Sequence, residues 1–221
     1  MKQMWTDLDH YIETHLIPED PILTQTLKHT DDRGYPDHLA VAPNQGMLLQ
    51  MLIQMNGCKR ILELGTFAAY STMWLARALP EDGYILTIEG RDAHAAVAQE
   101  NIDQAKLKQT IDLRVGRAAD ILKSLPADTA PFDFIFIDAD KQSYREYLEL
   151  SLNLSRSGTL IFLDNVIRAG DIINPDNHKP SIEGIREMFK LMQEHPRLLS
   201  STALQTVGSK GHDGFALAIV K

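Results

Sequence analysis

From residue 60 to residue 164, short apolar stretches alternate with segments of helical length, and this alternation constrains the fold more than any other feature. The clearest stretches, Phe134–Ile137 and Leu160–Leu163, contain no polar side chain, which is typical of parallel strands buried on both faces. Hydrophobic spacing predicts five strands, at 60–64, 84–88, 111–115, 134–137 and 160–163, and four intervening helices, at 71–79, 93–105, 118–125 and 143–154. The sequence therefore predicts an α/β fold with right-handed crossovers, a parallel sheet and helices on both faces.

The two ends of the chain follow different patterns. Before the first strand, helical spacing predicts three helices, around 8–16, from Pro21 toward Thr30, and from Pro43 to Met55. After an irregular segment at 165–181 and a helix at 182–193, two β-prone stretches at 199–207 and 215–220 flank a glycine-rich loop at 208–214, which predicts an antiparallel hairpin. We expect one domain, with an N-terminal helical cap at 1–57 and an α/β core at 58–221.

The composition limits the possible partners and location. A chain of 221 residues with 44% apolar residues can bury a full core, and its length fits one large domain. The net charge of -8 and the scattered Lys and Arg argue against nucleic acid, because binding to phosphates needs a concentrated basic face. Cys58 is the only cysteine, so no internal disulfide can form. We find neither a signal-peptide pattern nor an apolar stretch of membrane-spanning length, and we expect a cytoplasmic protein that does not associate with membranes.

A glycine and an acid mark a candidate cofactor site. Gly65 ends the first predicted strand, and small residues after it lead into a helix, whose free N–H groups can approach a ligand. A single glycine does not fit the G-x-G-x-x-G pattern that binds a diphosphate. Glu89 ends the second strand, near the spacing from Gly65 at which an acid accepts hydrogen bonds from two ribose hydroxyls. The pattern favours a ribose at this site and disfavours a diphosphate.

Glu63 lies inside the first predicted strand, among apolar residues. A buried carboxylate without partners is strongly destabilising, so this one must be hydrogen-bonded. Two interpretations remain open. Glu63 binds a cationic group of the ligand or nearby backbone N–H groups, or it belongs to a structural network within the turn.

Oxygen ligands follow the fourth and fifth predicted strands. Asp138 comes directly after Phe134–Ile137, and Asp164 and Asn165 follow Leu160–Leu163. Carboxyl ends of neighbouring parallel strands meet at one edge of a sheet, where α/β folds bind their ligands. Two carboxylates and a carboxamide form the hard oxygen set that suits Mg²⁺ or Ca²⁺ better than zinc, so we predict a metal site. For any one of the three residues, a strand-end cap bonded to a loop is the structural alternative.

Lys141 follows Asp138 by three residues, where the chain leaves the fourth predicted strand. An ammonium group beside a divalent cation loses its proton more readily, which makes Lys141 the candidate general base. The structural alternative is an exposed lysine on the first turn of a helix.

Four motifs resemble those of the cation-dependent O-methyltransferases, the family of catechol and caffeoyl-CoA O-methyltransferases: ILELGTFAAYST, LTIE, FIFIDADK and LIFLDNV. The resemblance covers residues 40–221, and the N-terminal helices resemble the extension of the smaller, caffeoyl-CoA-type members. It implies a Rossmann-like class I methyltransferase fold, in which a seven-stranded, mostly parallel sheet has an antiparallel C-terminal strand. It also implies S-adenosylmethionine as the methyl donor.

The same resemblance assigns roles to individual residues. It makes Asp138, Asp164 and Asn165 the metal ligands and Lys141 the base, and it places the Gln45-Gly46 turn beside the donor. The donor contacts that it implies are Val41, Glu63, Gly65, Ser71, Glu89, Ala118, Asp138 and Asp140. The chain departs from the family pattern at Ala69, where a second glycine is usual, and around Ala118, where polar residues often lie beside the adenine.

These residues predict a metal-dependent O-methyltransferase that acts on one hydroxyl of a small aromatic molecule with two adjacent hydroxyls. The cation, Mg²⁺ or alternatively Ca²⁺ or Mn²⁺, would hold both hydroxyls and make one of them more acidic. The sequence does not decide between catechol, caffeoyl and flavonoid acceptors, and a homodimer is expected from the resemblance alone. Two alternatives remain: a nicotinamide-dependent oxidoreductase, which would not explain the three oxygen ligands, and a non-catalytic methyltransferase-like binding protein.

Overall fold

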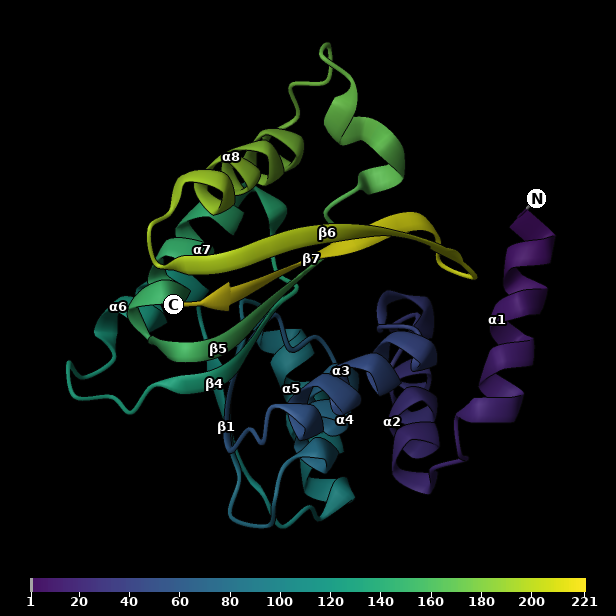
Figure 1. Ribbon diagram of the computed structural model, residues 1–221. Coiled ribbons are helices and arrows are strands. Elements are labelled where there is room, and N and C mark those ends of the chain that lie inside the picture. Colours follow the sequence, from purple (N-terminus) through teal and green to yellow (C-terminus); the bar gives the residue numbers. More distant parts are fainter. Residues whose placement is uncertain (1) are drawn as a thin grey trace.

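The computed structural model describes residues 2–221 and has a seven-stranded sheet at its centre (Figure 1). The strand order is β3-β2-β1-β4-β5-β7-β6. The strands are β1 (Arg60–Leu64), β2 (Tyr84–Glu89), β3 (Thr110–Val115), β4 (Phe132–Ile137), β5 (Ser155–Asp164), β6 (Leu198–Gly208) and β7 (Gly211–Val220). Strands β1 to β5 pair in parallel, whereas β7 runs antiparallel to both β5 and β6. The predicted mostly parallel sheet with a reversed C-terminal strand is confirmed.

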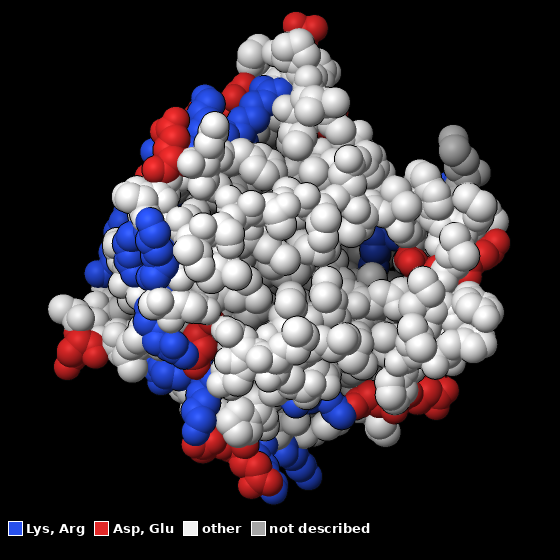
Figure 2. Space-filling view, in the orientation of Figure 1, with Lys and Arg blue, Asp and Glu red and all other residues white. Residues whose placement is uncertain are grey.

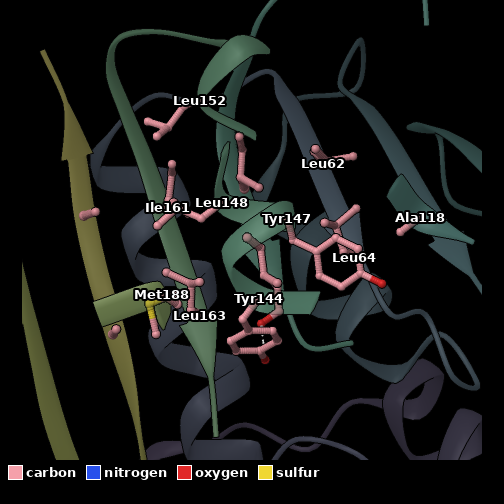
Figure 3. Close-up of a cluster of buried hydrophobic side chains, with 14 of the residues drawn as sticks. Leu62, Leu64, Ala118, Tyr144, Tyr147, Leu148, Leu152, Ile161, Leu163 and Met188 are labelled. Atoms are coloured by element: carbon pink, nitrogen blue, oxygen red, sulfur yellow. Dashed lines mark hydrogen bonds between the residues drawn. The ribbon is translucent and has the colours of Figure 1, made fainter. Parts of the chain in front are cut away.

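Helices cover both faces of the sheet, and each layer has its own apolar core (Figure 1). One face packs against α6 (Ala118–Ser124), α7 (Tyr144–Asn153) and α8 (Pro180–Glu194). The other packs against α3 (Pro43–Met55), α4 (Tyr70–Ala78) and α5 (Asp92–Ala105). Successive strand residues point to opposite faces, so Leu62 joins the first core and Ile61 the second. Figure 3 shows side chains of the first core, with α7 residues such as Leu148 against Ile161 of β5.

The N-terminal helices differ in how far they join the core. Helix α1 (Lys2–Leu16) buries none of its residues and lies beside the β6–β7 hairpin (Figure 1). Helix α2 (Pro21–Asp32) begins at a capping residue, because Asp20 Oδ1 accepts hydrogen bonds from the backbone N–H groups of Ile22 (2.9 Å) and Leu23 (3.2 Å). A short 3-10 helix, η1 (Asp37–Leu39), leads to α3, whose apolar face is buried with β1 and β4. The third helix of the predicted cap is therefore part of the core.

The predictions for the polar connections were less accurate than those for the buried elements. The loop predicted at 208–214 is wrong in length, because β7 begins at Gly211 and only Ser209 and Lys210 separate the two strands. Strand β5 begins at Ser155, five residues before the predicted start. Both errors fall on polar residues and glycines, whose backbone pairing leaves no hydrophobic pattern. The segment after β5 contains a kinked 3-10 helix, η3 (Arg168–Ile173), and another, η2 (Lys141–Ser143), follows β4.

Within residues 2–221, no helix combines the length and the apolar character needed to cross a membrane.

Candidate functional site

The carboxyl ends of the central strands open onto two adjoining cavities. The first, of about 610 Å³, lies over the ends of β1, β2 and β4, and we call it the strand-end cavity. The second, of about 1020 Å³, lies between the N-terminal helices and the β6–β7 hairpin, and we call it the cap cavity. Figure 2 shows the surface hollowed beside α1. Val41, Asp138 and Asn165 line both cavities, so the cavities meet at the end of β4.

The strand-end cavity gathers most of the predicted donor contacts. Its lining includes Val41, Gly65, Ser71, Glu89, Ala118, Asp138 and Asp140. Glu63 is the exception, because its side chain is fully buried behind the cavity wall. Asp140 accepts a hydrogen bond from the Tyr147 hydroxyl, which fixes this carboxylate at the cavity.

Gly65 allows the ends of β1 and β4 to approach each other. Its φ is 95°, and a Cβ atom at this position would lie 2.2 Å from the backbone oxygen of Asp138. A backbone hydrogen bond from Asp138 N to Leu64 O (2.8 Å) fixes the same approach, and one from Gly65 N to Ile88 O (2.9 Å) ties Gly65 to β2 on its other side. A glycine is therefore required for both its conformation and its size.

The loop after Gly65 holds two non-glycine residues in the left-handed region, Phe67 (φ 50°) and Ala69 (φ 64°). Such residues each cost about 1 kcal/mol or more, and they persist where surrounding contacts impose them. Glu89 supplies one such contact, because its Oε2 accepts from Phe67 N (2.8 Å) and its Oε1 from Arg91 N (3.0 Å). The alanine that replaces the usual glycine thus keeps the loop conformation at an energetic cost.

Glu63 is the centre of a buried hydroxyl network. Its carboxylate accepts hydrogen bonds from Ser71 Oγ (2.5 Å), Thr72 Oγ1 (2.5 Å) and Thr87 Oγ1 (2.7 Å). Burial raises the pKa of Glu63 to about 7, although the three hydroxyl groups partly offset the effect. These partners correspond to the structural interpretation of Glu63, with Ser71 as its link to the cavity.

The three predicted metal ligands lie together where the two cavities meet. Asp138 and Asn165 line both cavities, and Asp164 lines the cap cavity. Asn165 has a left-handed backbone (φ 55°), and among the side chains that the structure describes its amide has no hydrogen-bond partner. Burial and the charge of Asp138 raise the pKa of Asp164 well above its usual range, an effect that Lys141, Gln45 and the Asn165 N–H partly offset.

This donor set fits a hard divalent cation. The carboxylates of Asp138 and Asp164 share one nearby ammonium group, that of Lys141. A cation bound between the two carboxylates would lower the electrostatic cost of ionising Asp164. The amide oxygen of Asn165 would supply a third oxygen ligand. In the part of the chain that the structure describes, no group of three or more His, Cys, Asp or Glu side chains could hold a metal, so this mixed set is the candidate.

Lys141 lies beside the candidate metal ligands but does not line either cavity. Its Nζ donates to Asp138 Oδ1 (2.6 Å) and to the Tyr144 hydroxyl (2.7 Å), and its side chain is 10% exposed. The alternative of an exposed lysine is therefore wrong. Arg168 lines the cap cavity, whereas Lys179, the other cation of the loop after β5, does not.

The structure gives Gln45 a different place from the predicted one, and it adds Tyr144, which the sequence-based analysis of function missed: Gln45 lines the cap cavity and not the strand-end cavity where the donor was expected. Gln45 Nε2 donates to Asp164 Oδ2 (2.7 Å), a contact between α3 and β5. The hydroxyl of Tyr144 lies 2.7 Å from Asp164 O and 3.0 Å from Ile137 O. Tyr144 fits the apolar pattern of α7, and the resemblance placed Gln45 beside the donor and not beside Asp164, so only tertiary contacts reveal both partners.

Comparison with known proteins agrees with this geometry. A family model described as O-methyltransferase matches residues 13–218. The catechol O-methyltransferase of Niastella koreensis is 48% identical over 99% of each chain. The crystal structure of the O-methyltransferase from Bacillus cereus in complex with SAH has a TM-score of 0.95 and 45% identity and covers 100% of both chains. A second crystal structure, of the O-methyltransferase TomG from Streptomyces achromogenes in complex with SAM, has a TM-score of 0.94 and 39% identity. The match covers 100% of this chain and 98% of the TomG chain.

Proposed function

This chain belongs to the O-methyltransferase family and takes its methyl group from S-adenosylmethionine, and we propose that it methylates one hydroxyl of a vicinal aromatic diol with the help of a divalent cation such as Mg²⁺. The observation that carries the proposal is that Asp138 and Asn165 line both cavities. A cation held by these residues and Asp164 would lie between a donor in the strand-end cavity and an acceptor in the cap cavity.

The strand-end cavity suits S-adenosylmethionine. Glu89 ends β2 with both carboxylate oxygens already oriented by backbone N–H groups, and the ribose hydroxyls of the donor would bind there. Ser71 and Asp140 would lie near its amino-acid portion. The absence of a second glycine in the Gly65 loop disfavours the diphosphate of a nicotinamide cofactor, and the relatives are methyltransferases, so neither the oxidoreductase nor the non-catalytic alternative is favoured.

The cap cavity suits a flat, apolar acceptor. Its walls include the apolar side chains of Val41, Met47, Met51 and Phe215, which would exclude water from the reacting groups. Its volume of about 1020 Å³ is at the upper end of the range for drug-sized ligands, so acceptors larger than catechol itself would fit. Diols of the caffeoyl or flavonoid kind belong to this size class.

Proton removal would fall to Lys141. When bound, the cation would supply positive charge that lowers the pKa of a coordinated hydroxyl. Lys141 Nζ lies 2.6 Å from Asp138 Oδ1, and it would have to exchange this contact for the acceptor hydroxyl to take its proton. The Tyr144 hydroxyl holds the ammonium group within reach of the end of β4.

Replacement of one metal ligand tests the proposal. We expect Asp164→Ala to abolish Mg²⁺-dependent methylation of a catechol while the Kd for S-adenosylmethionine stays within a few fold, because Asp164 does not line the strand-end cavity. Lys141→Ala should keep Mg²⁺ binding and lose most of kcat. Unchanged turnover of Asp164→Ala in the presence of a chelator would refute the metal-dependent mechanism.

We also propose that the protein forms a homodimer through the exposed edge of the sheet. Strand β6 is the last strand of the sheet and contains no charged residue. Its side chains Leu199, Leu204 and Val207 are each more than half exposed. Figure 2 shows that this face of the molecule is broadly uncharged. Such an edge is a ready template for association with a second chain.

A further inference from the structure

Asp164 is held by three hydrogen-bonding groups that are not themselves predicted to bind the metal: a backbone N–H, a side-chain amide and a hydroxyl. Its two carboxylate oxygens have different partners: Oδ1 accepts from the backbone N–H of Asn165 (2.8 Å), and Oδ2 accepts from the side chain of Gln45 (2.7 Å). Its backbone oxygen lies 2.7 Å from the hydroxyl of Tyr144. The carboxylate and the main chain of this residue are therefore fixed independently.

Gln45 brings the N-terminal cap to the site. It lies in the first turn of α3, it lines the cap cavity, and its amide reaches across to the end of β5. A neutral amide can donate one hydrogen bond to a carboxylate oxygen and leave that oxygen able to bind a cation. Gln45 thus orients Asp164 without competing for the cation as a second charged group would.

Tyr144 connects both strand ends to the lysine. Its side chain is fully buried on the side of α7 that faces the sheet (Figure 3). The hydroxyl lies within hydrogen-bond distance of Ile137 O, just before Asp138, and of Asp164 O. It also accepts a hydrogen bond from Lys141 Nζ (2.7 Å). The Tyr144 hydroxyl therefore contacts the ends of both β4 and β5, which carry the candidate ligands, and the ammonium group of Lys141.

We infer that Gln45 and Tyr144 are positioning residues of the cation site: Gln45 orients the carboxylate of Asp164, and Tyr144 sets the separation of the β4 and β5 ends and orients Lys141 Nζ. The inference rests on the proposed function. Residues that orient metal ligands typically change metal affinity by 10- to 100-fold when they are replaced. Of the two residues, Tyr144 contacts Lys141 and Gln45 does not, so their replacement should affect kcat differently.

The test compares Gln45→Met and Tyr144→Phe, which keep the size of each side chain and remove its polar group. Mg²⁺ alone is titrated calorimetrically into each protein, and kcat and KM for a catechol are measured at saturating Mg²⁺. We expect both variants to bind Mg²⁺ at least about tenfold more weakly than the wild type, with the Kd for S-adenosylmethionine within twofold. Saturating Mg²⁺ should restore kcat in Gln45→Met but not in Tyr144→Phe.

Matched controls carry the same substitutions away from the site. Gln54→Met lies on the same helix at an exposed position, and Tyr84→Phe removes a hydroxyl that bonds Asp112 (3.0 Å) at the opposite end of the strands. Both should bind Mg²⁺ like the wild type.

The outcomes separate this inference from the proposed function. Mg²⁺ affinity within twofold of the wild type in both variants would overturn the inference and leave the proposed function intact. Full recovery of kcat by Tyr144→Phe at saturating Mg²⁺ would overturn the claim that Tyr144 orients Lys141. If the wild type itself binds no Mg²⁺, the metal assignment fails and the inference fails with it. Chemical denaturation checks that each variant is folded. If Tyr144→Phe does not fold, the Mg²⁺ affinity of Gln45→Met still tests whether contacts to Asp164 position this ligand.

Discussion

At the scale of single residues, the site depends on close contacts that tolerate little change. Gly65 has a positive φ and lies against the backbone of Asp138, a candidate metal ligand. Its replacement would move the end of β4 and with it the ligand. The position therefore affects both folding and the geometry of the site.

We predict that Gly65→Ala destabilises the protein by about 3 kcal/mol, because the added Cβ combines a steric clash with an unfavourable backbone conformation. Gly158→Ala is the matched control, since Gly158 also has a positive φ (84°) but no atom lies within 4 Å of its added Cβ. The control should cost about 1 kcal/mol. Urea denaturation of both variants measures the difference, and equal losses would contradict the role of the Asp138 contact.

A second prediction at this scale concerns the pH dependence of stability, and it follows from the raised pKa of Glu63. The pKa is raised from 4.5 to about 7 by burial, so the folded state retains a proton that the unfolded state loses between these values. The contribution of this retained proton to the unfolding free energy is fully present below pH 4.5 and is lost as the pH rises through 7. We expect the unfolding free energy of the wild type, relative to Glu63→Gln, to fall by up to about 3 kcal/mol from pH 4.5 to 8. Urea titrations of both proteins across this range test it, and a constant difference would show that Glu63 is not protonated on folding.

At the scale of elements, α1 forms a wall of the cap cavity without joining the core. It buries none of its residues, yet Ile12 and Leu16 line the cavity. Asp9 accepts a hydrogen bond from Ser209 N (2.7 Å), which attaches the helix to the turn of the hairpin. We therefore regard α1 as a determinant of acceptor binding rather than of stability.

We predict that the double variant Ile12→Ser/Leu16→Ser raises the KM for a large diphenol several-fold. The unfolding free energy should change by less than about 0.5 kcal/mol, because both side chains are exposed. Leu8→Ser, on the same helix but outside the cavity lining, should leave the KM unchanged. Steady-state kinetics and urea denaturation provide the two measurements. A KM equal to that of the wild type would remove α1 from acceptor binding.

At the scale of the whole molecule, the two edges of the sheet differ in charge. Strand β3 at one edge carries Asp112 and Arg114, whereas β6 at the other carries no charge. Charged side chains on an edge strand oppose association with another chain, and their absence permits it. The proposed homodimer is therefore expected at the β6 edge.

Light scattering should give a mass twice the 24.8 kDa of the chain. Leu204→Lys, which places a charge on β6, should shift the protein to the monomer. Val115→Lys adds the same charge to an exposed position on β3 and should leave the dimer intact. A monomeric wild type at all concentrations would contradict the proposal.

The sequence by itself determined the sheet, the order of its helices and the residues that follow its strands. These features have local signals, since buried strands are wholly apolar and polar residues at their carboxyl ends interrupt the pattern, as at Asp138 and Asp164. The motifs of the family added the donor site to this pattern.

Only the tertiary structure decided which side chains contact one another across the chain. Gln45 meets Asp164 across 119 positions of sequence, and Tyr144 joins the ends of β4 and β5 from within an apolar helix face. Neither contact leaves a periodic or compositional trace, because each depends on how α3 and α7 pack onto the sheet. For the same reason, the hydroxyl partners of Glu63 and the meeting of the two cavities at Asn165 emerge only when the whole chain is folded.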